Sequence, residues 1–215
     1  VYSSVYGGGT SNSEFEFLTG NSMANCAAST YPYESYDLSD ATNIVEYLKD
    51  TQGYDTLAFH PYGPENWNRP AVYNDFGFNT YLCWDDMEDP QYVSWAISDE
   101  SDYEKVEEIL DEKEAADQPL FLFNVTMQNH GGYALDDLAE DTAPISIEST
   151  YSGYEDVVMY LTLMRESDYE FVSLLTNLEQ WEEPIIVCLF GDHQPSLNEE
   201  FLNTVTVQDG ENEVA

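Results

Sequence analysis

Three short apolar runs constrain the fold of this chain more than any other feature. They cover Thr56–Phe59, Leu120–Met127 and Ile185–Phe190. Near-continuous apolarity, rich in β-branched and aromatic residues, is typical of strands buried on both faces of a parallel or mixed sheet. Helical patterns separate the runs, and alternating strands and helices indicate an α/β layer fold. We therefore expect one α/β domain over residues 1–215, with a central mixed, mostly parallel sheet flanked by helices.

Three other segments have apolar residues at helical spacing. They are Ser39–Leu48, Asp102–Ala116 and Tyr154–Leu178, and their periodicity predicts helices. Ser39 is a residue type that caps helix N-termini, so we expect it to begin the first of them. The segment Gly132–Ser152 is polar and aperiodic, which predicts an irregular surface segment.

The charge balance excludes several classes of function. Five Lys and Arg stand against 43 Asp and Glu, for a formal net charge of −38. So few cations cannot neutralise many phosphates, which argues against nucleic acid as a partner and against electrostatic docking on anionic lipid. The chain is 42% hydrophobic and 14% aromatic, too apolar for a disordered acidic tail. No apolar stretch is long enough to cross a bilayer, so we expect this segment itself to be soluble.

The cysteines Cys26, Cys83 and Cys188 do not have the spacing of a zinc site or a redox pair. Cys188 lies within an apolar run, which predicts a buried thiol. Cys26 and Cys83 could form a disulfide, and the odd number leaves the redox compartment open.

Each apolar run is followed by one of the three histidines. His60 and His193 come directly or shortly after their runs, and His130 follows the middle one. Ligand sites of α/β sheets form at the carboxyl ends of the strands. The pattern therefore favours one shared site over three unrelated surface histidines.

The segment Phe190-Gly191-Asp192-His193 ends the last apolar run abruptly. Glycine permits a sharp turn, after which a carboxylate and an imidazole project together. This pair of side chains is typical of ligands for Zn²⁺ or Mn²⁺.

A glycine-rich turn, Gly7 to Gly9, precedes a predicted helix. Ser11 or Asn12 could cap it, which would put Glu14 in its first turn. Backbone amides at such a helix start, with the Thr10 hydroxyl, suit a phosphate-like group. The turn lacks the Gly-Lys-Ser/Thr of a nucleotide P-loop, and a plain flexible turn before a capped helix is the alternative.

Arg69 is one of two arginines and lies near His60 and Trp67. A guanidinium in that setting suits bidentate recognition of phosphate, although a salt bridge with one of the many carboxylates is the alternative. Arg165 falls in the middle of a predicted helix, and we expect a structural role for it.

Taken in order, these segments resemble the extracellular catalytic domain of lipoteichoic acid synthases, phosphoglycerol transferases of the sulfatase and alkaline phosphatase superfamily. The resemblance rests on Gly8 to Phe15, on His60 with Trp67-Asn68-Arg69, on Asn129-His130 and on Gly191-Asp192-His193. It spans most of the chain. It implies a sulfatase-like catalytic domain that the sequence contains only in part, truncated at both ends.

The resemblance also implies a mechanism. Thr10 looks like the nucleophile that attacks phosphatidylglycerol, or a similar phospholipid, to form a covalent glycerophospho-threonine before transfer to a growing glycerophosphate polymer. Thr10, Asp192 and His193 would hold a divalent metal, which is manganese in the best-known relatives, although magnesium or zinc would accept the same ligands. The substrate pocket would comprise His60, Trp67, Arg69 and His130.

Two departures from the family and a location follow from the same resemblance. The family has a further metal ligand, a glutamate that would precede Val1, and it often has an acidic residue where this chain has Tyr62. We expect the parent protein to act on the extracellular face of the cell membrane, attached by a segment absent from this sequence.

Other functions stay open. A related metal-dependent sulfatase, phosphoesterase or phosphoethanolamine transferase would use the same scaffold. Sulfatases proper carry a Cys/Ser-x-Pro-x-Arg motif, which does not follow Thr10 here. A catalytically silent acidic surface module is the alternative from another class.

Overall fold

The computed structural model describes residue 5, residues 8–147 and residues 153–206, and its centre is a three-stranded parallel sheet. The strands are β1 (Asp55–His60), β2 (Thr80–Cys83) and β3 (Leu120–Asn124), in the order β2-β1-β3. The runs at Thr56–Phe59 and Leu120–Met127 are thus confirmed as strands, the second one shorter than expected. The expected sheet is confirmed as parallel, and β2 was not predicted.

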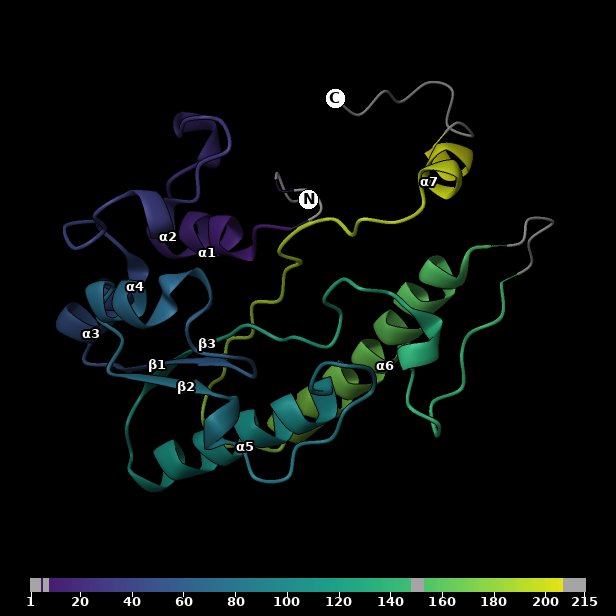
Figure 1. Ribbon diagram of the computed structural model, residues 1–215. Helices are drawn as coiled ribbons and strands as arrows, with labels where there is room; N and C mark the ends of the chain where they lie inside the picture. The colour runs from purple at the N-terminus through teal and green to yellow at the C-terminus, as the bar shows by residue number, and fades with distance from the viewer. Residues whose placement is uncertain (1–4, 6–7, 148–152, 207–215) are drawn as a thin grey trace.

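Helices cover both faces of the sheet, as Figure 1 shows. The α-helices are α1 (Thr10–Thr19), α2 (Pro32–Ser35), α3 (Ile44–Gln52), α4 (Arg69–Asp75), α5 (Asp99–Ala115), α6 (Glu155–Leu178) and α7 (Glu199–Thr206). Four short 3₁₀ turns are η1 (Met23–Asn25), η2 (Asn66–Asn68), η3 (Trp84–Asp86) and η4 (Leu135–Asp137). Helices α1 to α4 lie on one side of the sheet, and α5 and α6 on the other.

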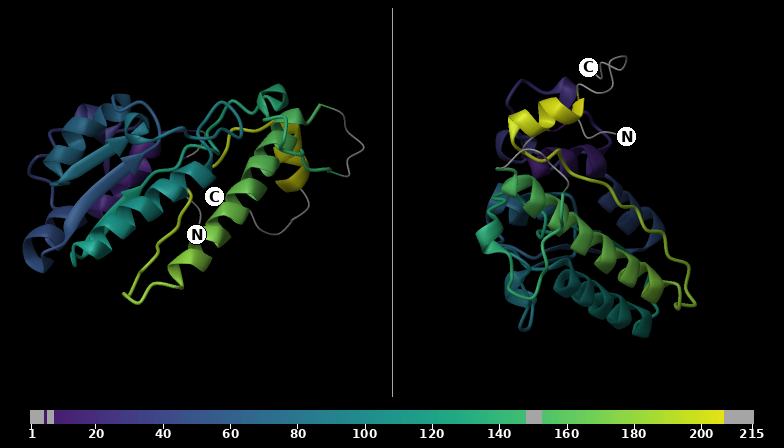
Figure 2. Two further views of the ribbon diagram at one scale, coloured as in Figure 1. Left: turned by 90° about the horizontal axis from the view of Figure 1, so that it is seen from below. Right: turned by 90° about the vertical axis from the view of Figure 1, so that its right-hand side faces the viewer.

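The central strand β1 packs against both layers because its side chains alternate between the faces. Ala58 belongs to the cluster formed with α1, α3 and α4, whereas Leu57 and Phe59 belong to the cluster formed with α5 and α6. All six residues of β1 are buried. Figure 2 shows α5 and α6 side by side beneath the sheet.

The third predicted strand is wrong. Ile185–Phe190 is extended but forms no strand, and all its side chains are exposed, with Ile186 at 97%. Apolarity favours a strand only where a neighbouring strand accepts the backbone hydrogen bonds, and this segment pairs with neither edge of the described sheet. The prediction of a buried Cys188 is wrong for the same reason, since its side chain is exposed.

Two further predictions, one of a helix cap and one of a disulfide, are wrong. Asn43, not Ser39, caps the first predicted helix, because its side chain accepts a hydrogen bond from Glu46 N at 2.9 Å and α3 begins one residue later. Cys26 and Cys83 are free thiols rather than a disulfide.

The other predicted segments agree more closely. Helices α5 and α6 begin three residues before and one residue after the positions expected. The irregular segment predicted at Gly132–Ser152 is irregular over residues 132–147 apart from η4, and residues 148–152 lie outside the described residues. Arg165 is structural, since its Nη2 donates to Ala143 O at 2.6 Å. Within the part of the chain that the structure describes, no helix is long and apolar enough to cross a membrane.

Parallel strands place their carboxyl ends at one edge of the sheet. His60, Cys83 and Asn124 end the three strands there. The N-terminus of α5 comes to the same edge, because α5 leads back across the sheet to the start of β3. This edge therefore collects polar side chains from several elements, as expected for an α/β ligand site.

Candidate active site

Thr10 is the first residue of α1. Gly9 holds the N-cap position in the left-handed region (φ 97°), and Asn12 N donates to its carbonyl at 2.8 Å. The expected cap by Ser11 or Asn12 is therefore wrong, and Glu14 lies beyond the first turn. Gly9 suits the position because a side chain there would be strained. The Thr10 hydroxyl stands at the positive end of the helix, where anionic groups are stabilised.

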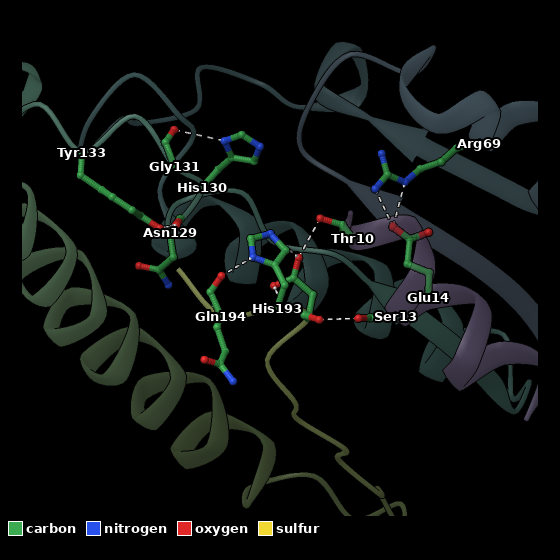
Figure 3. A network of polar contacts seen from close by, with 11 residues as sticks. Thr10, Ser13, Glu14, Arg69, Asn129, His130, Gly131, Tyr133, His193 and Gln194 are labelled. Carbon is green, nitrogen blue, oxygen red and sulfur yellow. Dashed lines mark hydrogen bonds and ion pairs between the residues drawn. The ribbon is translucent and has the colours of Figure 1, made fainter. Parts of the chain in front are cut away.

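Thr10, Asp192 and His193 converge, although 182 residues separate the first from the second. Thr10 Oγ1 donates a hydrogen bond to Asp192 Oδ2 at 2.7 Å, and His193 Nε2 lies 3.2 Å from the same carboxylate oxygen. Figure 3 shows the side chains of Thr10 and His193 close to each other.

The segment that carries Asp192 and His193 is fixed by contacts to the N-terminal residues. Ser13 Oγ donates to Asp192 O, and Gln194 N donates to Val5 O at 3.1 Å. The ring of Phe190 lies 4.9 Å from that of Phe17 on α1. Figure 1 shows this yellow-green segment running from the end of α6 back to the start of α1.

The atoms that Asp192 and His193 present to each other test whether the three residues fit a cation. His193 Nδ1 lies 3.0 Å from Gln194 O, which can only accept, so Nδ1 carries the ring hydrogen. Nε2 then faces Asp192 Oδ2 at 3.2 Å, and a cation bound here would be shared by these two atoms. A hydroxyl, a carboxylate and an imidazole suit Mn²⁺, Zn²⁺ or Mg²⁺.

These three side chains are chemically suitable as metal ligands, but they are few. Among the described residues, no group of three or more His, Cys, Asp or Glu side chains is placed to hold a metal ion. Thr10, Asp192 and His193 supply only two such side chains and a hydroxyl. A bound cation would need at least one more ligand from outside these three residues.

A buried ion pair lies beside Thr10. Arg69 Nε and Nη2 both donate to Glu14 Oε1, at 3.1 and 2.5 Å, and Tyr73 Oη donates to Glu14 Oε2 at 2.8 Å. Arg69 is 1% exposed. Burial alone would lower the pKa of Arg69, but the adjacent Glu14 carboxylate outweighs it and raises that pKa. The salt-bridge alternative for Arg69 is thus confirmed. Arg69 also lines the cavity described below, and its recognition of phosphate stays a prediction.

Trp67 sits on a strained turn. Trp67 and Asn68 both have left-handed backbone angles, with φ 58° and 54°. Such angles in consecutive non-glycine residues are unfavourable and tend to occur at functional sites. The Trp67 ring contacts that of Tyr31 at 4.8 Å.

The two pocket histidines differ in environment. His60 is 3% exposed, and its Nδ1 lies 2.7 Å from Val125 O. Burial, assisted by the positive charge of Arg69, lowers the pKa of His60 to about 4, so the ring is neutral at physiological pH. His130 is exposed, and its ring meets the edge of Trp95 at 5.3 Å.

All seven residues proposed from the sequence line one cavity of about 670 Å³. They are Thr10, His60, Trp67, Arg69, His130, Asp192 and His193. The cavity has the size usual for small-molecule sites. The structure therefore brings together residues from four separate parts of the sequence.

The sequence analysis missed a polar network at the other end of this cavity. Ser167 Oγ on α6 donates to Asp99 Oδ2 and accepts hydrogen bonds from Gln128 and Asn129. Burial raises the pKa of Asp99 to about 6. The available signal was a Ser-Asp pair at the start of a helix and two amide side chains, Gln128 and Asn129, shortly after β3.

Comparisons with known proteins agree with this architecture. Residues 1–214 match the family model described as Sulfatase. A Rhizobium meliloti protein named for cyclic β-1,2-glucan modification is 31% identical over 204 residues, which are 95% of this chain and 31% of that protein. The Streptococcus pyogenes phosphoglycerol transferase GacH, solved in complex with sn-glycerol-1-phosphate, has a TM-score of 0.78 and 27% identity, covering 92% of this chain and 52% of that one.

A third relative supports the fold. The lipoteichoic acid synthase LtaP of Listeria monocytogenes has a TM-score of 0.69 at 19% identity, over 83% of this chain and 42% of that one. The fold is that of the sulfatase and alkaline phosphatase superfamily. The chain belongs to the sulfatase family. It spans about half or less of the length of the relatives it matches.

Proposed function

We propose that this chain is the catalytic part of a metal-dependent phosphoglycerol transferase acting on a phospholipid such as phosphatidylglycerol. The observation that carries the proposal is the hydrogen bond from Thr10 to Asp192 at a helix N-terminus, with His193 on the same carboxylate. The similarity to a phosphoglycerol transferase solved with glycerol phosphate supports it. The parent protein would act outside the cell, attached to the membrane through a segment outside this sequence.

In the first half-reaction, Thr10 Oγ1 attacks the phosphorus of the lipid. The bond from phosphorus to Thr10 forms, and the bond from phosphorus to the diacylglycerol oxygen breaks. Thr10 gives its proton to Asp192 Oδ2, its hydrogen-bond acceptor, and this proton passes through solvent to the leaving diacylglycerol oxygen, so that Asp192 ends unprotonated. A divalent cation held by Thr10, Asp192 and His193 would lower the pKa of the hydroxyl and offset charge on the phosphoryl oxygens.

The pocket residues orient the glycerophosphate. His60 is neutral, with Nδ1 on Val125 O, so its Nε2 can accept a hydrogen bond from a glycerol hydroxyl. Arg69 Nη1 has no hydrogen-bond partner among the described residues, so it can donate to a phosphate oxygen while Glu14 fixes the rest of the guanidinium. Trp67 supplies a rigid wall.

In the second half-reaction, an acceptor alcohol attacks the phosphorus and releases Thr10. The new phosphorus–oxygen bond forms on the acceptor, whose hydroxyl proton returns to the threonine oxygen. The lipoteichoic acid synthase similarity suggests a glycerophosphate polymer as acceptor, and the name of the Rhizobium relative suggests a glucan. Either acceptor suits the same chemistry at Thr10.

The test is a donor panel on the full-length protein. We expect Mn²⁺-dependent release of diacylglycerol from phosphatidylglycerol, and little turnover of a phosphoethanolamine lipid or of an aryl sulfate. Chelation with EDTA should abolish release, and added Mn²⁺ should restore it. Preferential cleavage of the aryl sulfate would favour a sulfatase instead, and the absence of both bound metal and turnover would favour the silent module.

A further inference from the structure

Two carboxyl groups are buried without a positive partner at the start of α5. Asp99 and Asp102 are 1% and 0% exposed, and their spacing puts them on the same face of the helix. All five Lys and Arg side chains bond to other groups, and no ion pair among the described residues includes Asp99 or Asp102. Buried carboxylates in such a place are balanced by a proton or by a bound cation.

Each of these carboxyl groups has one oxygen with a hydrogen bond and one without. Ser167 Oγ donates to Asp99 Oδ2, and Asn124 Nδ2 donates to Asp102 Oδ1. The other two oxygens, Asp99 Oδ1 and Asp102 Oδ2, are buried and have no hydrogen-bond partner among the described residues. Buried oxygens of this kind are rare in folded proteins, and they indicate that something else binds there.

Two amide oxygens beside the carboxyl groups also have no partner in the part of the chain that the structure describes. The bond from Asn124 to Asp102 puts the first amide next to one carboxyl group. Asn129 Nδ2 donates to Ser167 Oγ at 2.6 Å, which puts the second amide next to the other carboxyl group, on Asp99. The four atoms Asp99 Oδ1, Asp102 Oδ2, Asn124 Oδ1 and Asn129 Oδ1 form what we call the four-oxygen cluster.

The positive N-terminus of α5 does not supply partners for this cluster. Asp99 N donates to Gln128 Oε1 at 2.8 Å. Ser101 N donates to Ser98 Oγ at 3.2 Å, and Asp102 N donates to Ser98 O at 3.0 Å. The helix start therefore makes negative charge nearby less unfavourable, but these three N–H groups are already used.

We infer that the four-oxygen cluster binds a calcium ion. Ca²⁺ takes about six to eight oxygen ligands from carboxylates, amide side chains and water, whereas Mg²⁺ dehydrates reluctantly. The cluster contains no nitrogen or sulfur atom, which disfavours Zn²⁺. Asp99, Asn124 and Asn129 line the cavity, so the ion can enter from it and complete its coordination with water. The two carboxylates balance the two positive charges of the ion.

This site uses none of the three residues proposed to hold the catalytic metal, and the inference does not rest on the proposed transfer reaction. The ion would join the start of α5 and the end of β3 to Asn129, and Figure 3 shows Asn129 beside His130. It would thus fix the segment that carries His130 into the cavity. In the calcium-free protein, burial raises the pKa of both Asp99 and Asp102, so that protons compete for the place of the ion.

Calcium binding is measured by isothermal titration calorimetry on the full-length protein, freed of metal by EDTA and dialysis. Physiological ionic strength screens the many surface carboxylates. We expect one saturable site with a Kd of about 1 mM or tighter, the range of extracellular calcium modules, and a rise in Tm with Ca²⁺. Asp102→Asn keeps the shape and removes the charge. It should weaken binding at least about tenfold and abolish the rise in Tm.

Asp168→Asn is the matched control, because Asp168 lines the same cavity with an exposed side chain and the charge change is equal. It should bind calcium like the unmutated protein, and so should Asp192→Asn. Circular dichroism checks folding, and Asp99→Asn, with the same expected loss, replaces Asp102→Asn if that variant does not fold.

Three results would overturn the inference. One is the absence of saturable binding up to about 10 mM Ca²⁺, well above the range of such sites. The second is unchanged affinity in the folded Asp102→Asn or Asp99→Asn variant. The third is a loss of binding in Asp192→Asn alone, which would place the ion beside Thr10 instead.

Discussion

The strand β1 and the segment Ile185–Phe190 have nearly the same apolar pattern and opposite environments. All six residues of β1 are buried between two parallel neighbours and two helical layers. The later segment has no strand partner in the described sheet, and its side chains are exposed. Apolarity alone therefore indicates a segment that can be buried, whereas burial itself depends on what the rest of the chain provides.

The two regions also supply different residues of the site. The packed region supplies Thr10, His60 and Arg69 on helices and strands with buried neighbours. The C-terminal segment supplies Asp192 and His193, and it contacts Thr10, Ser13, Val5 and Phe17. We therefore expect substitutions in the first region to affect both stability and activity, and those in the second to affect activity alone.

Asp192→Asn should show the difference between the two regions most clearly. A neutral amide is a poor ligand for a hard cation, so the loss of diacylglycerol release should exceed the roughly 10- to 100-fold typical of residues that only support metal ligands. The free energy of unfolding should change by less than about 1 kcal/mol, because the Asp192 side chain is 40% exposed. Asp40→Asn, an exposed control of equal charge change, should alter neither. Strong destabilisation by Asp192→Asn would contradict the division.

Glu14→Gln should show the opposite pattern. It leaves the buried guanidinium of Arg69 uncompensated, which costs about 3–5 kcal/mol of stability in comparable buried pairs. Urea unfolding measures the effect. The control is Glu108→Gln, because Glu108 is 57% exposed in its pair with Lys105 and such pairs contribute less than about 1 kcal/mol. Equal, small effects of both substitutions would mean that the Arg69 pair is not buried.

We expect the stability of the protein to depend on pH through Asp99, which lies in the packed region. Burial raises the pKa of Asp99 to about 6, above its value in an unfolded chain, so the folded state binds the proton more tightly. The stability that this group contributes is therefore present at low pH and is lost as pH rises from about 4 to about 6, by up to about 3 kcal/mol. Asp102 is shifted in the same direction.

The measurement is the difference in unfolding free energy between the unmutated protein and Asp99→Asn as a function of pH. Taking the difference cancels most of the contribution of His60, whose lowered pKa acts in the opposite direction over the same range. A difference that stays flat between pH 4 and 6 would contradict the burial of this carboxyl group.

The smallest expected effect concerns a helix cap. Asn43→Ala should destabilise the protein by about 1 kcal/mol, because its side chain accepts the hydrogen bond from Glu46 N. Ser39→Ala should cost much less, since Ser39 lies outside α3 and its hydroxyl bonds, among the described residues, to Asp37. Thermal denaturation of both variants tests the corrected helix start, and a reversed order would restore Ser39 as the cap.

The sequence predicted the fold where local pattern and packing agree. The strand β1 and the helices α5 and α6 have strong periodicity, and the structure has them within a few residues of the expected bounds. The strand prediction failed for Ile185–Phe190, an apolar run that has no partner strand in the described sheet. It missed β2, whose four residues include only one buried side chain and so give no strong apolar signal.

For the candidate site, sequence order was more informative than local geometry. A histidine after each apolar run predicted residues that the structure collects in one cavity. Distances across the chain could not be predicted, because the meeting of Thr10 with Asp192 depends on the path of the chain over a separation of 182 positions. The salt bridge between Glu14 and Arg69 was hidden for the same reason, since any of 43 carboxylates could have been the partner.

The central claim is that Thr10 becomes covalently phosphorylated by the donor lipid. The most direct measurement incubates the full-length protein with phosphatidylglycerol and Mn²⁺ in the absence of acceptor, followed by mass spectrometry of the peptide that contains Thr10. The account predicts a glycerophosphate group on Thr10 that disappears when an acceptor is added, and neither adduct nor diacylglycerol release in Thr10→Ala. Continued diacylglycerol release by Thr10→Ala, with no adduct on the unmutated protein, would contradict it.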